Sequence, residues 1–443
     1  MSKMKKIIAC IASMAVAVVS LVSFTSVVSA DIAPNPVISR DCPAYSGSSQ
    51  STAYAACDAY YYSSWYGTAP DYLAYDLSAV PEIERKKVIA VWYNNTANYD
   101  YTIGNYGGSS SSMPTEYTIE VNASEGGAYP ADGWVVVDTV TDNTLHSRQH
   151  LVDMEGYNWI RMNITGADGK ESGSVGINMD VHNVSNGVSD SWIFFGDSIT
   201  AGGMMNCYGT GFAELVNAID SSYFPIQENG GIGGILSSHG KENIDRWLES
   251  YPGKYVSIAY GTNDSWGNQT GAQGYYENTA YMVEAVLAKG MIPVVPKIPY
   301  ATETGVNSYL DDYNAMIDKL YEEYPQVVKG PDFDALFREN PDLLSGDGVH
   351  PSSEGYAEMR ELWAKTMYEN VYMAGSGAPA MGDINFDGNV NVADAVLLRS
   401  YVLGKIDGIE NFNSSLADIN SDSALDVFDV IAMRQLLVAL NSI

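Results

Sequence analysis

The sequence predicts a multidomain protein in which a β-sandwich is followed by an α/β/α three-layer domain and a small all-α module. Three observations lead to this order. Residues 31–190 hold short apolar runs between polar, Gly-rich turns, residues 191–372 alternate apolar strands with amphipathic helices, and residues 382–443 contain a duplicated acidic segment. With 443 residues, the chain is too long for one ordinary core, which agrees with several domains.

The first 30 residues have the layout of a secretory signal peptide. Lys3, Lys5 and Lys6 precede an apolar run, and the small residues Val28-Ser29-Ala30 follow it. We expect cleavage after Ala30 and a secreted, extracellular protein. An uncleaved membrane anchor is the alternative, which the short apolar run disfavours. No other stretch of the sequence could span a bilayer.

The net charge narrows the class of binding partners, and the cysteine content leaves the disulfide state open. The formal net charge of −31 disfavours nucleic acid and anionic membranes as partners. Cys42 and Cys57 fit either a disulfide across a short loop or two free thiols. Cys207 reads as an ordinary small packed residue.

The segment 31–190 is expected to form the sandwich. Strands are predicted over Val88–Tyr93, Tyr117–Val121 and Trp134–Val137, and their pattern resembles jelly-roll or galactose-binding-like domains. Trp65 and Trp159 are candidates for stacking on sugar rings if they are exposed, and for core packing if they are not.

The segment 191–372 is expected to form a parallel sheet with crossover helices, and a linker rich in Gly, Ser, Ala and Pro follows over residues 373–381. The predicted strands are Trp192–Phe195, Phe224–Gln227, Tyr255–Tyr260 and Met291–Pro296. The predicted helices are Tyr275–Lys289, Ser308–Tyr324 and Ser353–Tyr372.

Ser198 is the candidate nucleophile of this domain. It follows an apolar strand in the sequence Phe195-Gly196-Asp197-Ser198, at the strand end where open α/β sheets place reactive groups. A serine hydroxyl needs a base to take its proton, and His350 is the preferred one because Asp347 precedes it by one short turn. His239 is the rival base, but it has no acidic neighbour so placed. The remaining histidines are His146, His150 and His182.

Two further strand ends offer donors for a developing oxyanion. Gly231 lies in the Gly-rich run 229–234, where a backbone N–H can approach a substrate closely. Asn263 in Gly261-Thr262-Asn263-Asp264 can donate from its side-chain amide, and the N–H of Ser198 would be the third donor. Trp266 is either an aromatic wall of the cleft or a core residue.

Together these segments resemble the four sequence blocks of the SGNH (GDSL) hydrolases. The blocks occur in order and cover essentially all of Trp192–Tyr372. The resemblance implies that Ser198 is the nucleophile, that Gly231 and Asn263 are oxyanion donors, and that Asp347 and His350 complete the triad. Catalysis would then need no cofactor. The G-x-S-x-G elbow of the α/β-hydrolases is absent from the sequence.

The tail contains two similar loops that begin at Asp383 and Asp418. Each has oxygen ligands at positions 1, 3, 5 and 12, a backbone carbonyl at position 7 and a polar group at position 9, as in EF-hand calcium loops. A solvated acidic turn is the alternative. The expected Ca²⁺ ligands are Asp383, Asn385, Asp387, Asn389, Asn391 and Asp394 in the first loop and Asp418, Asn420, Asp422, Ala424, Asp426 and Asp429 in the second.

Only the helix after each loop is apparent, and this pattern resembles the dockerin modules of cellulosomal enzymes. The resemblance implies structural Ca²⁺ and the cohesin domain of a scaffoldin as partner. The expected contact residues are Val392, Ala393 and Arg399 in the first repeat and Val427, Phe428 and Arg434 in the second. Ser423 replaces the glycine at position 6, so the second loop is expected to bind Ca²⁺ more weakly.

A jelly roll, an SGNH domain and a dockerin together resemble cellulosome-associated carbohydrate esterases. The architecture implies hydrolysis of O-acetyl esters of plant polysaccharide, with acetylxylan or acetylmannan as substrate. Esterases acting on pectin or rhamnogalacturonan acetyl groups, or on feruloyl or lipid esters, are the enzymatic alternatives. A non-catalytic carbohydrate-binding component is the alternative from another class, and the intact set of catalytic residues disfavours it.

Overall fold

The computed structural model describes residues 36–61, 63–94, 112–167, 173–185, 190–205, 210–249, 251–373, 382, 384, 390, 392–404, 417–420 and 424–440. The expected signal peptide, Cys207 and the linker after Met373 lie outside these ranges. Within them, every helix is too short or too polar to cross a lipid bilayer.

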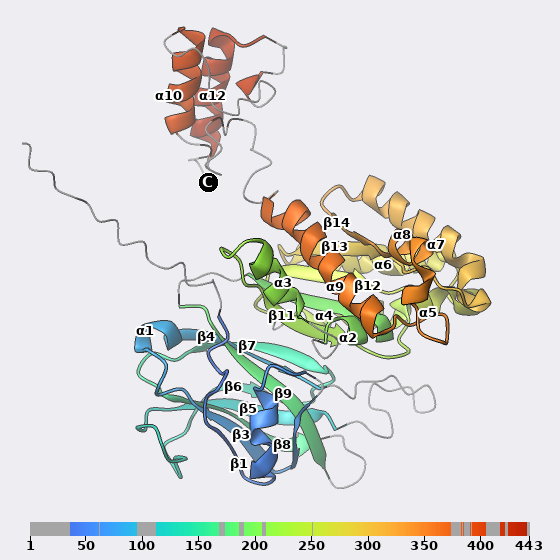
Figure 1. The fold of residues 1–443 in the computed structure, drawn as a ribbon. Helices are drawn as coiled ribbons and strands as arrows, with labels where there is room; N and C mark the ends of the chain where they lie inside the picture. Colours follow the sequence, from blue (N-terminus) through green and yellow to red (C-terminus); the bar gives the residue numbers. More distant parts are fainter. Residues whose placement is uncertain are drawn as a thin grey trace, which may run out of the picture. The chain divides into compact units, whose positions relative to one another are not determined.

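The N-terminal part consists of two antiparallel sheets (Figure 1). The five-stranded sheet has the order β1 (Ala44–Ser46), β3 (Asp71–Asp76), β8 (Trp159–Ala167), β5 (Pro114–Asn122) and β6 (Val135–Val140). The four-stranded sheet has the order β2 (Trp65–Thr68), β9 (Ser174–Asn183), β4 (Lys87–Tyr93) and β7 (Ser147–Asp153). The short helices η1 (Gln50–Ala56) and α1 (Glu82–Arg85) lie between strands.

One hydrophobic core joins the inner faces of the two sheets. Leu73 and Tyr75 of β3 are fully buried in the same cluster as Val88 of β4 and Ile177 of β9. Because side chains alternate along a strand, each sheet turns one face to this core. The predicted β-sandwich is therefore present, whereas its assignment as a jelly roll stays a prediction.

The two candidate tryptophans and the two cysteines of the sandwich are all packed in its interior. Trp65 and Trp159 are each 0% exposed, so the alternative of core packing is the right one and neither ring can stack on a sugar. Cys42 and Cys57 are both buried free thiols, so the disulfide between them is not formed. The N-terminal segment is tied down by its packing into the core of the sandwich instead.

The second domain contains a five-stranded parallel sheet. Its order is β11 (Ile226–Gly231), β10 (Ser191–Gly196), β12 (Tyr255–Ala259), β13 (Ile292–Lys297) and β14 (Val328–Asp332). The four predicted strands are confirmed within a few residues. The strand β14 was not predicted, because Lys329, Gly330 and Pro331 lack an apolar pattern and are tolerated only at the edge of the sheet.

Helices cover both faces of this sheet, which gives the predicted three layers (Figure 1). Trp192 and Phe194 of β10 pack with α3 (Phe212–Ile219), α8 (Phe333–Glu339) and α9 (Ser353–Met367). Ile193 and Phe195 point to the opposite face, where they pack with α4 (Ser237–Trp247), α6 (Ala272–Ala288) and α7 (Thr304–Glu323). The last helix continues as the π-helical segment η5 (Tyr368–Met373).

Buried polar contacts link the outer face of β7 to the sheet of the second domain. Ser147 Oγ donates to Glu228 Oε1 over 2.7 Å, and Gln149 Nε2 donates to the carbonyl of Trp192 over 3.3 Å. Burial raises the pKa of Glu228 to about 7, although the hydrogen bond from Ser147 opposes the shift. The contact between the sandwich and the second domain thus includes a carboxyl group whose pKa lies near neutral pH.

The described part of the tail contains the helices α10 (Val392–Val402) and α12 (Val427–Leu440). Ile384, Leu398, Ala417 and Met433 form its small core. The predicted helix after each acidic loop is present.

Candidate active site

Ser198 is the first residue of the short helix α2 (Ser198–Gly203), directly after β10. The side chain of Asp197 caps this helix by accepting a hydrogen bond from the N–H of Ile199 over 2.9 Å. Gly196 makes the sharp turn possible, since a Cβ at this position would lie 2.1 Å from Oγ1 of Thr200. The local sequence therefore holds the Ser198 hydroxyl at the C-terminal edge of the sheet.

Ser198, His350 and Asp347 form a continuous hydrogen-bonded chain. Nε2 of His350 lies 2.7 Å from Oγ of Ser198, and Nδ1 of His350 lies 2.7 Å from Oδ2 of Asp347. The distances fit a neutral imidazole that accepts the serine proton at one nitrogen while the carboxylate orients the other. The structure thus brings together the three residues that the sequence predicts as a triad.

The remaining oxygen of Asp347 is engaged by its own turn. Oδ1 accepts hydrogen bonds from the N–H groups of Val349 and His350 over 2.9 Å each, and from the hydroxyl of Ser345 over 2.8 Å. Burial raises the pKa of Asp347, but these hydrogen bonds and that from the His350 ring outweigh it and leave the pKa well below its ordinary value. Asp347 is therefore a carboxylate at neutral pH.

The rival base His239 is placed differently. It lies in α4, where its Nδ1 accepts a hydrogen bond from the N–H of Leu236 over 3.0 Å. The other three histidines belong to the sandwich and are buried there. Of the five histidines, His350 is the one that forms a hydrogen bond with Ser198.

Asn263 lies in the short helix α5 (Thr262–Ser265) that follows β12. One N–H of its amide donates to the carbonyl of Ile235 over 3.1 Å, which leaves the second N–H for another acceptor. Its neighbour Asp264 is fully buried and accepts hydrogen bonds from Ser237 and Thr270, so the segment is fixed from both sides.

The structure does not support Gly231 as an oxyanion donor. Gly231 is the last residue of β11, pairs with Gly196, and donates its N–H to Oδ1 of Asn229 over 3.1 Å. A Cβ at this position would lie 2.2 Å from the N of Ala201, so close packing against α2 explains why the residue is a glycine. The signal that the sequence analysis missed lies further along the same glycine-rich run. Gly234 has a φ of 77° and precedes Ile235, whose carbonyl accepts the hydrogen bond from Asn263.

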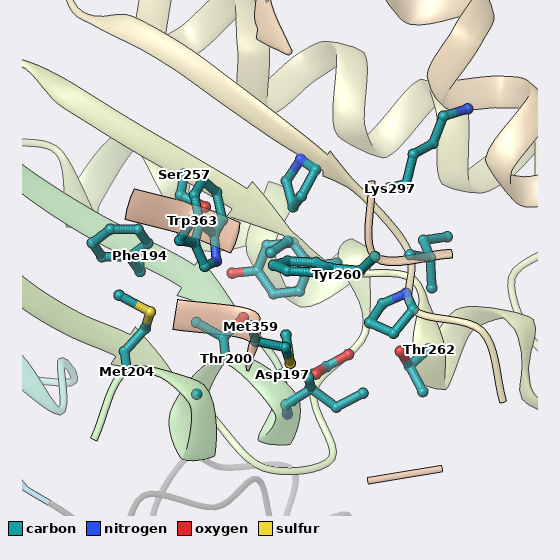
Figure 2. A pocket seen from close by; sticks show the side chains of 17 residues that line it. Phe194, Asp197, Thr200, Met204, Ser257, Tyr260, Thr262, Lys297, Met359 and Trp363 are labelled. Carbon is teal, nitrogen blue, oxygen red and sulfur yellow. Dashed lines mark hydrogen bonds between the residues drawn. The ribbon is translucent and has the colours of Figure 1, made fainter. Parts of the chain in front are cut away.

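A cavity borders the residues on either side of Ser198 (Figure 2). Asp197 and Thr200 line it together with Met204, Met359 and Trp363, whereas neither Ser198 nor His350 is among its lining residues. Burial raises the pKa of Asp197 to about 7, against the effect of the Ile199 N–H. This cavity therefore lies against the turn of Ser198 without reaching Ser198 or His350 themselves.

Trp266 begins the short helix η3 (Trp266–Asn268), three residues after Asn263, and is 40% exposed. It lies against the start of α7, where a Cβ at Gly305 would be 2.9 Å from the indole Nε1. The N–H of Thr302, just before α7, donates to the carbonyl of Gly348 in the turn of His350 over 2.8 Å. Because its side chain is 40% exposed, Trp266 is not a core residue.

Only part of the two acidic loops belongs to the described residues. Asp383, Asn385, Asp387, Asn389, Asn391 and Asp422 lie outside them. Asp394 and Asp429 at position 12 are fully buried, and each accepts an N–H from its loop, from Ile384 over 2.8 Å and from Asn420 over 3.3 Å. Asp418, Ala424 and Asp426 are also described, but the described residues alone contain no group of three or more acidic, His or Cys side chains placed to hold a metal.

Two family models match this chain. The GDSL-like Lipase/Acylhydrolase family matches residues 194–358, and the Dockerin type I domain matches residues 381–437. The first range contains Ser198, Asn263, Asp347 and His350. The chain thus matches the GDSL-like Lipase/Acylhydrolase family over its second domain and the Dockerin type I domain over its C-terminal part.

Two curated relatives match about two fifths of the chain. A multidomain esterase of Ruminococcus flavefaciens is 23% identical over 216 residues, which are 43% of this chain and 27% of that protein. A putative endoglucanase X of Acetivibrio thermocellus is 26% identical over 211 residues, which are 41% of this chain and 84% of that protein. The chain therefore spans about a quarter of the length of the first relative.

Solved structures similar to about two fifths of this chain include two bacterial proteins. A lipase/acylhydrolase from Enterococcus faecalis is 19% identical, with 40% of this chain and 95% of that chain covered and a TM-score of 0.35. An acetylxylan esterase from Geobacillus stearothermophilus is 20% identical, with 41% and 93% covered and a TM-score of 0.33. At these TM-scores neither likeness bears on substrate.

Proposed function

We propose that this chain is a secreted, cellulosome-associated serine esterase that removes O-acetyl groups from plant cell-wall polysaccharide. The single observation that carries the proposal is the hydrogen-bonded chain from Ser198 through His350 to Asp347. A serine hydroxyl paired with an oriented imidazole is the arrangement that acyl transfer requires.

In the proposed mechanism, Ser198 attacks the carbonyl carbon of an acetyl ester while His350 takes the hydroxyl proton. The tetrahedral intermediate collapses when protonated His350 returns that proton to the sugar oxygen, which leaves as an alcohol. Water then attacks the acetyl-enzyme, with His350 again as base. The bond between Oγ of Ser198 and the acetyl carbon breaks as His350 returns the proton to Oγ, and acetate leaves. Asp347 stabilises the imidazolium that forms in each step and stays ionised throughout.

The oxyanion is proposed to be bound by the N–H of Ser198 and the second amide N–H of Asn263. Gly231 is not proposed as a third donor, because its N–H donates to Asn229, and the neighbouring turn at Gly234, with a φ of 77°, is proposed to border the oxyanion instead. The hydrogen bond from Asn263 to Ile235 keeps this turn next to the amide. Preorganised donors of this kind are each worth roughly a hundredfold to a thousandfold in rate.

A polysaccharide acetyl ester is favoured over a lipid ester by the surroundings of the triad. Trp266 offers a half-exposed aromatic face, which suits the apolar face of a sugar ring, while the neighbouring residues Thr302 and Glu303 are polar. Acetylxylan and acetylmannan are the proposed substrates, and pectin acetyl groups are the alternative. The names of the two relatives, an esterase and a putative endoglucanase, agree with a place among polysaccharide-degrading enzymes.

The tail is proposed to bind Ca²⁺ and a cohesin. The donor set of both loops consists of carboxylate, amide and carbonyl oxygens, which suits Ca²⁺. When bound, Ca²⁺ would order the loops and have no role at Ser198. Val427 and Phe428 are 56% and 61% exposed, as the proposed cohesin contact requires.

The proposal is tested by measuring acetate release from acetylxylan, acetylmannan and acetylated pectin beside hydrolysis of long-chain nitrophenyl esters. We expect acetate release from xylan or mannan at rates well above hydrolysis of the long-chain esters. Hydrolysis of long-chain esters alone would contradict the carbohydrate substrate, and no hydrolysis of any ester would contradict the enzymatic function.

A further inference from the structure

We propose that Ser345 is a positioning residue of the catalytic triad, whose hydroxyl fixes the Asp347 carboxylate in the orientation that His350 needs. This inference rests on the proposed function, since it assigns a role to Ser345 through Asp347 and His350.

The physical problem is that the triad acid is exposed. The side chain of Asp347 is 51% exposed and that of His350 is 37% exposed. Water competes for an exposed carboxylate, and an exposed ion pair, such as Asp347 forms with protonated His350, contributes little by itself. The contact between Asp347 and His350 therefore needs fixed partners on Asp347 that do not depend on burial.

The turn supplies these partners, and Ser345 is the only side chain among the three that hold Oδ1 in the described structure. The N–H groups of Val349 and His350 reach Oδ1 from the C-terminal side of the turn, and the hydroxyl of Ser345 reaches it from the N-terminal side. With Oδ1 occupied in this way, Oδ2 is left to accept the Nδ1–H of His350. The three donors together define one rotamer of Asp347.

Ser345 also closes the turn with its backbone. Its N–H donates to the carbonyl of His350 over 2.7 Å, and its carbonyl accepts the N–H of Gly348 over 3.0 Å. A bridge between Leu344 and Pro351 continues this pairing outside the turn. Because these bonds use only backbone atoms, a substitution of the side chain leaves them in place, and the effect of the hydroxyl can be measured separately.

The loss of the hydroxyl has a predictable electrostatic consequence. A carboxylate with one donor fewer concentrates more negative charge on its oxygens, and this stabilises the protonated form of the adjacent imidazole. His350 is then protonated, and so unable to act as a base, at a higher pH than in the wild type. A residue that only stabilised the fold would change the amount of folded enzyme without moving the pH dependence.

The test compares wild type, Ser345→Ala, Ser345→Thr and Ser308→Ala as full-length proteins on a small acetyl ester. Ser308 is a matched control, because its exposed hydroxyl donates to the carbonyl of Thr304 in α7. For Ser345→Ala we expect a kcat about tenfold lower with KM unchanged, a fraction of the roughly 10²–10⁴-fold that a positioned base supplies. The acidic limb of its pH profile should move upward by about 0.3 units or more, as expected for a changed hydrogen bond to a charged group.

Ser345→Thr should restore kcat and the pH limb, and Ser308→Ala should match wild type. A second readout is the low-field proton resonance of His350 Nδ1–H, which should shift in Ser345→Ala and return in Ser345→Thr. A wild-type kcat and pH profile in folded Ser345→Ala would overturn the inference, as would a loss of kcat that leaves the pH limb and the resonance unmoved. If wild type itself turned over no ester, the proposed function would fail first, and this inference with it.

Discussion

Nε2 of His350 lies 2.7 Å from Oγ of Ser198, although 152 residues separate them in the sequence. The two residues belong to different segments of the domain. Ser198 starts the helix after β10, and His350 ends a turn just before α9. Parallel strands end at one edge of the sheet, so separate segments can deliver their side chains to the same place. This contact is the basis of the predictions that follow.

Removal of the Asn263 amide should damage the oxyanion site. We expect Asn263→Asp, which keeps the shape but lacks the donor, to lower kcat about 10²- to 10³-fold with a smaller change in KM. Gln269→Ala is the matched control, because the exposed side chain of Gln269 donates to the backbone carbonyl of Asn263. Steady-state kinetics on a small acetyl ester measures the difference, and a kcat near wild type would remove Asn263 from the proposed site.

Trp266 should affect carbohydrate substrates selectively. We expect Trp266→Ala to raise KM for acetylated oligosaccharides about three- to tenfold, the equivalent of roughly 0.5–1.5 kcal/mol of aromatic contact. Hydrolysis of nitrophenyl acetate, which lacks a sugar, should change little. Tyr281→Ala serves as control, since this tyrosine is equally exposed on α6. Equal effects on both substrates would argue against a sugar contact.

Glu228 should make the stability of the chain depend on pH. Its pKa is raised by burial to about 7, above that of an ordinary glutamate, so the folded protein binds its proton more tightly than the unfolded chain. Stability from this group is therefore fully present below about pH 4.5 and is lost as the pH rises through 7. A pKa shift of this kind changes the free energy of unfolding by an amount on the order of 1–3 kcal/mol.

The measurement is the free energy of unfolding of wild type and Glu228→Gln from pH 5 to pH 8. The amide stays neutral, so the difference between the two proteins should shift in favour of Glu228→Gln as the pH rises. A constant difference across this range would show that Glu228 is not protonated in the folded protein.

Removal of Ca²⁺ should separate the two functions of the chain. With a chelator, the helices α10 and α12 should lose their order and cohesin binding should disappear, because a calcium loop rarely keeps its structure without the ion. Acetate release should remain at the wild-type rate. Circular dichroism, a cohesin pull-down and an activity assay on one sample measure all three, and cohesin binding that survives chelation would contradict the calcium-dependent tail.

Much of the architecture could be predicted because its signals are local. The strand β10 and the turn to Ser198 are visible in the eight consecutive residues Ser191–Ser198, and the two acidic loops repeat the same spacing. The edge strand β14 could not be predicted, because pairing on a single side leaves no apolar pattern in Lys329, Gly330 and Pro331.

The details of the site depend on tertiary contacts that cannot be inferred from the sequence. Gly231 and Gly234 lie in one glycine-rich run, and the strand pairing and hydrogen bond of Gly231 and the positive φ of Gly234 separate a packed strand residue from a turn residue. The exposure of Trp266 and the burial of Trp65 and Trp159 likewise follow from tertiary packing. Residue type alone allowed both readings of each tryptophan.

The most direct test of the account is the rate of acetate release by Ser198→Ala, with folding and cohesin binding measured on the same preparation. Loss of the nucleophile should lower kcat by roughly 10⁵- to 10⁶-fold, to the residual rate that binding and the oxyanion donors support. Folding and cohesin binding should match wild type. Acetate release close to the wild-type rate from this folded variant would mean that another group forms the acyl-enzyme, and the triad assigned here would be wrong.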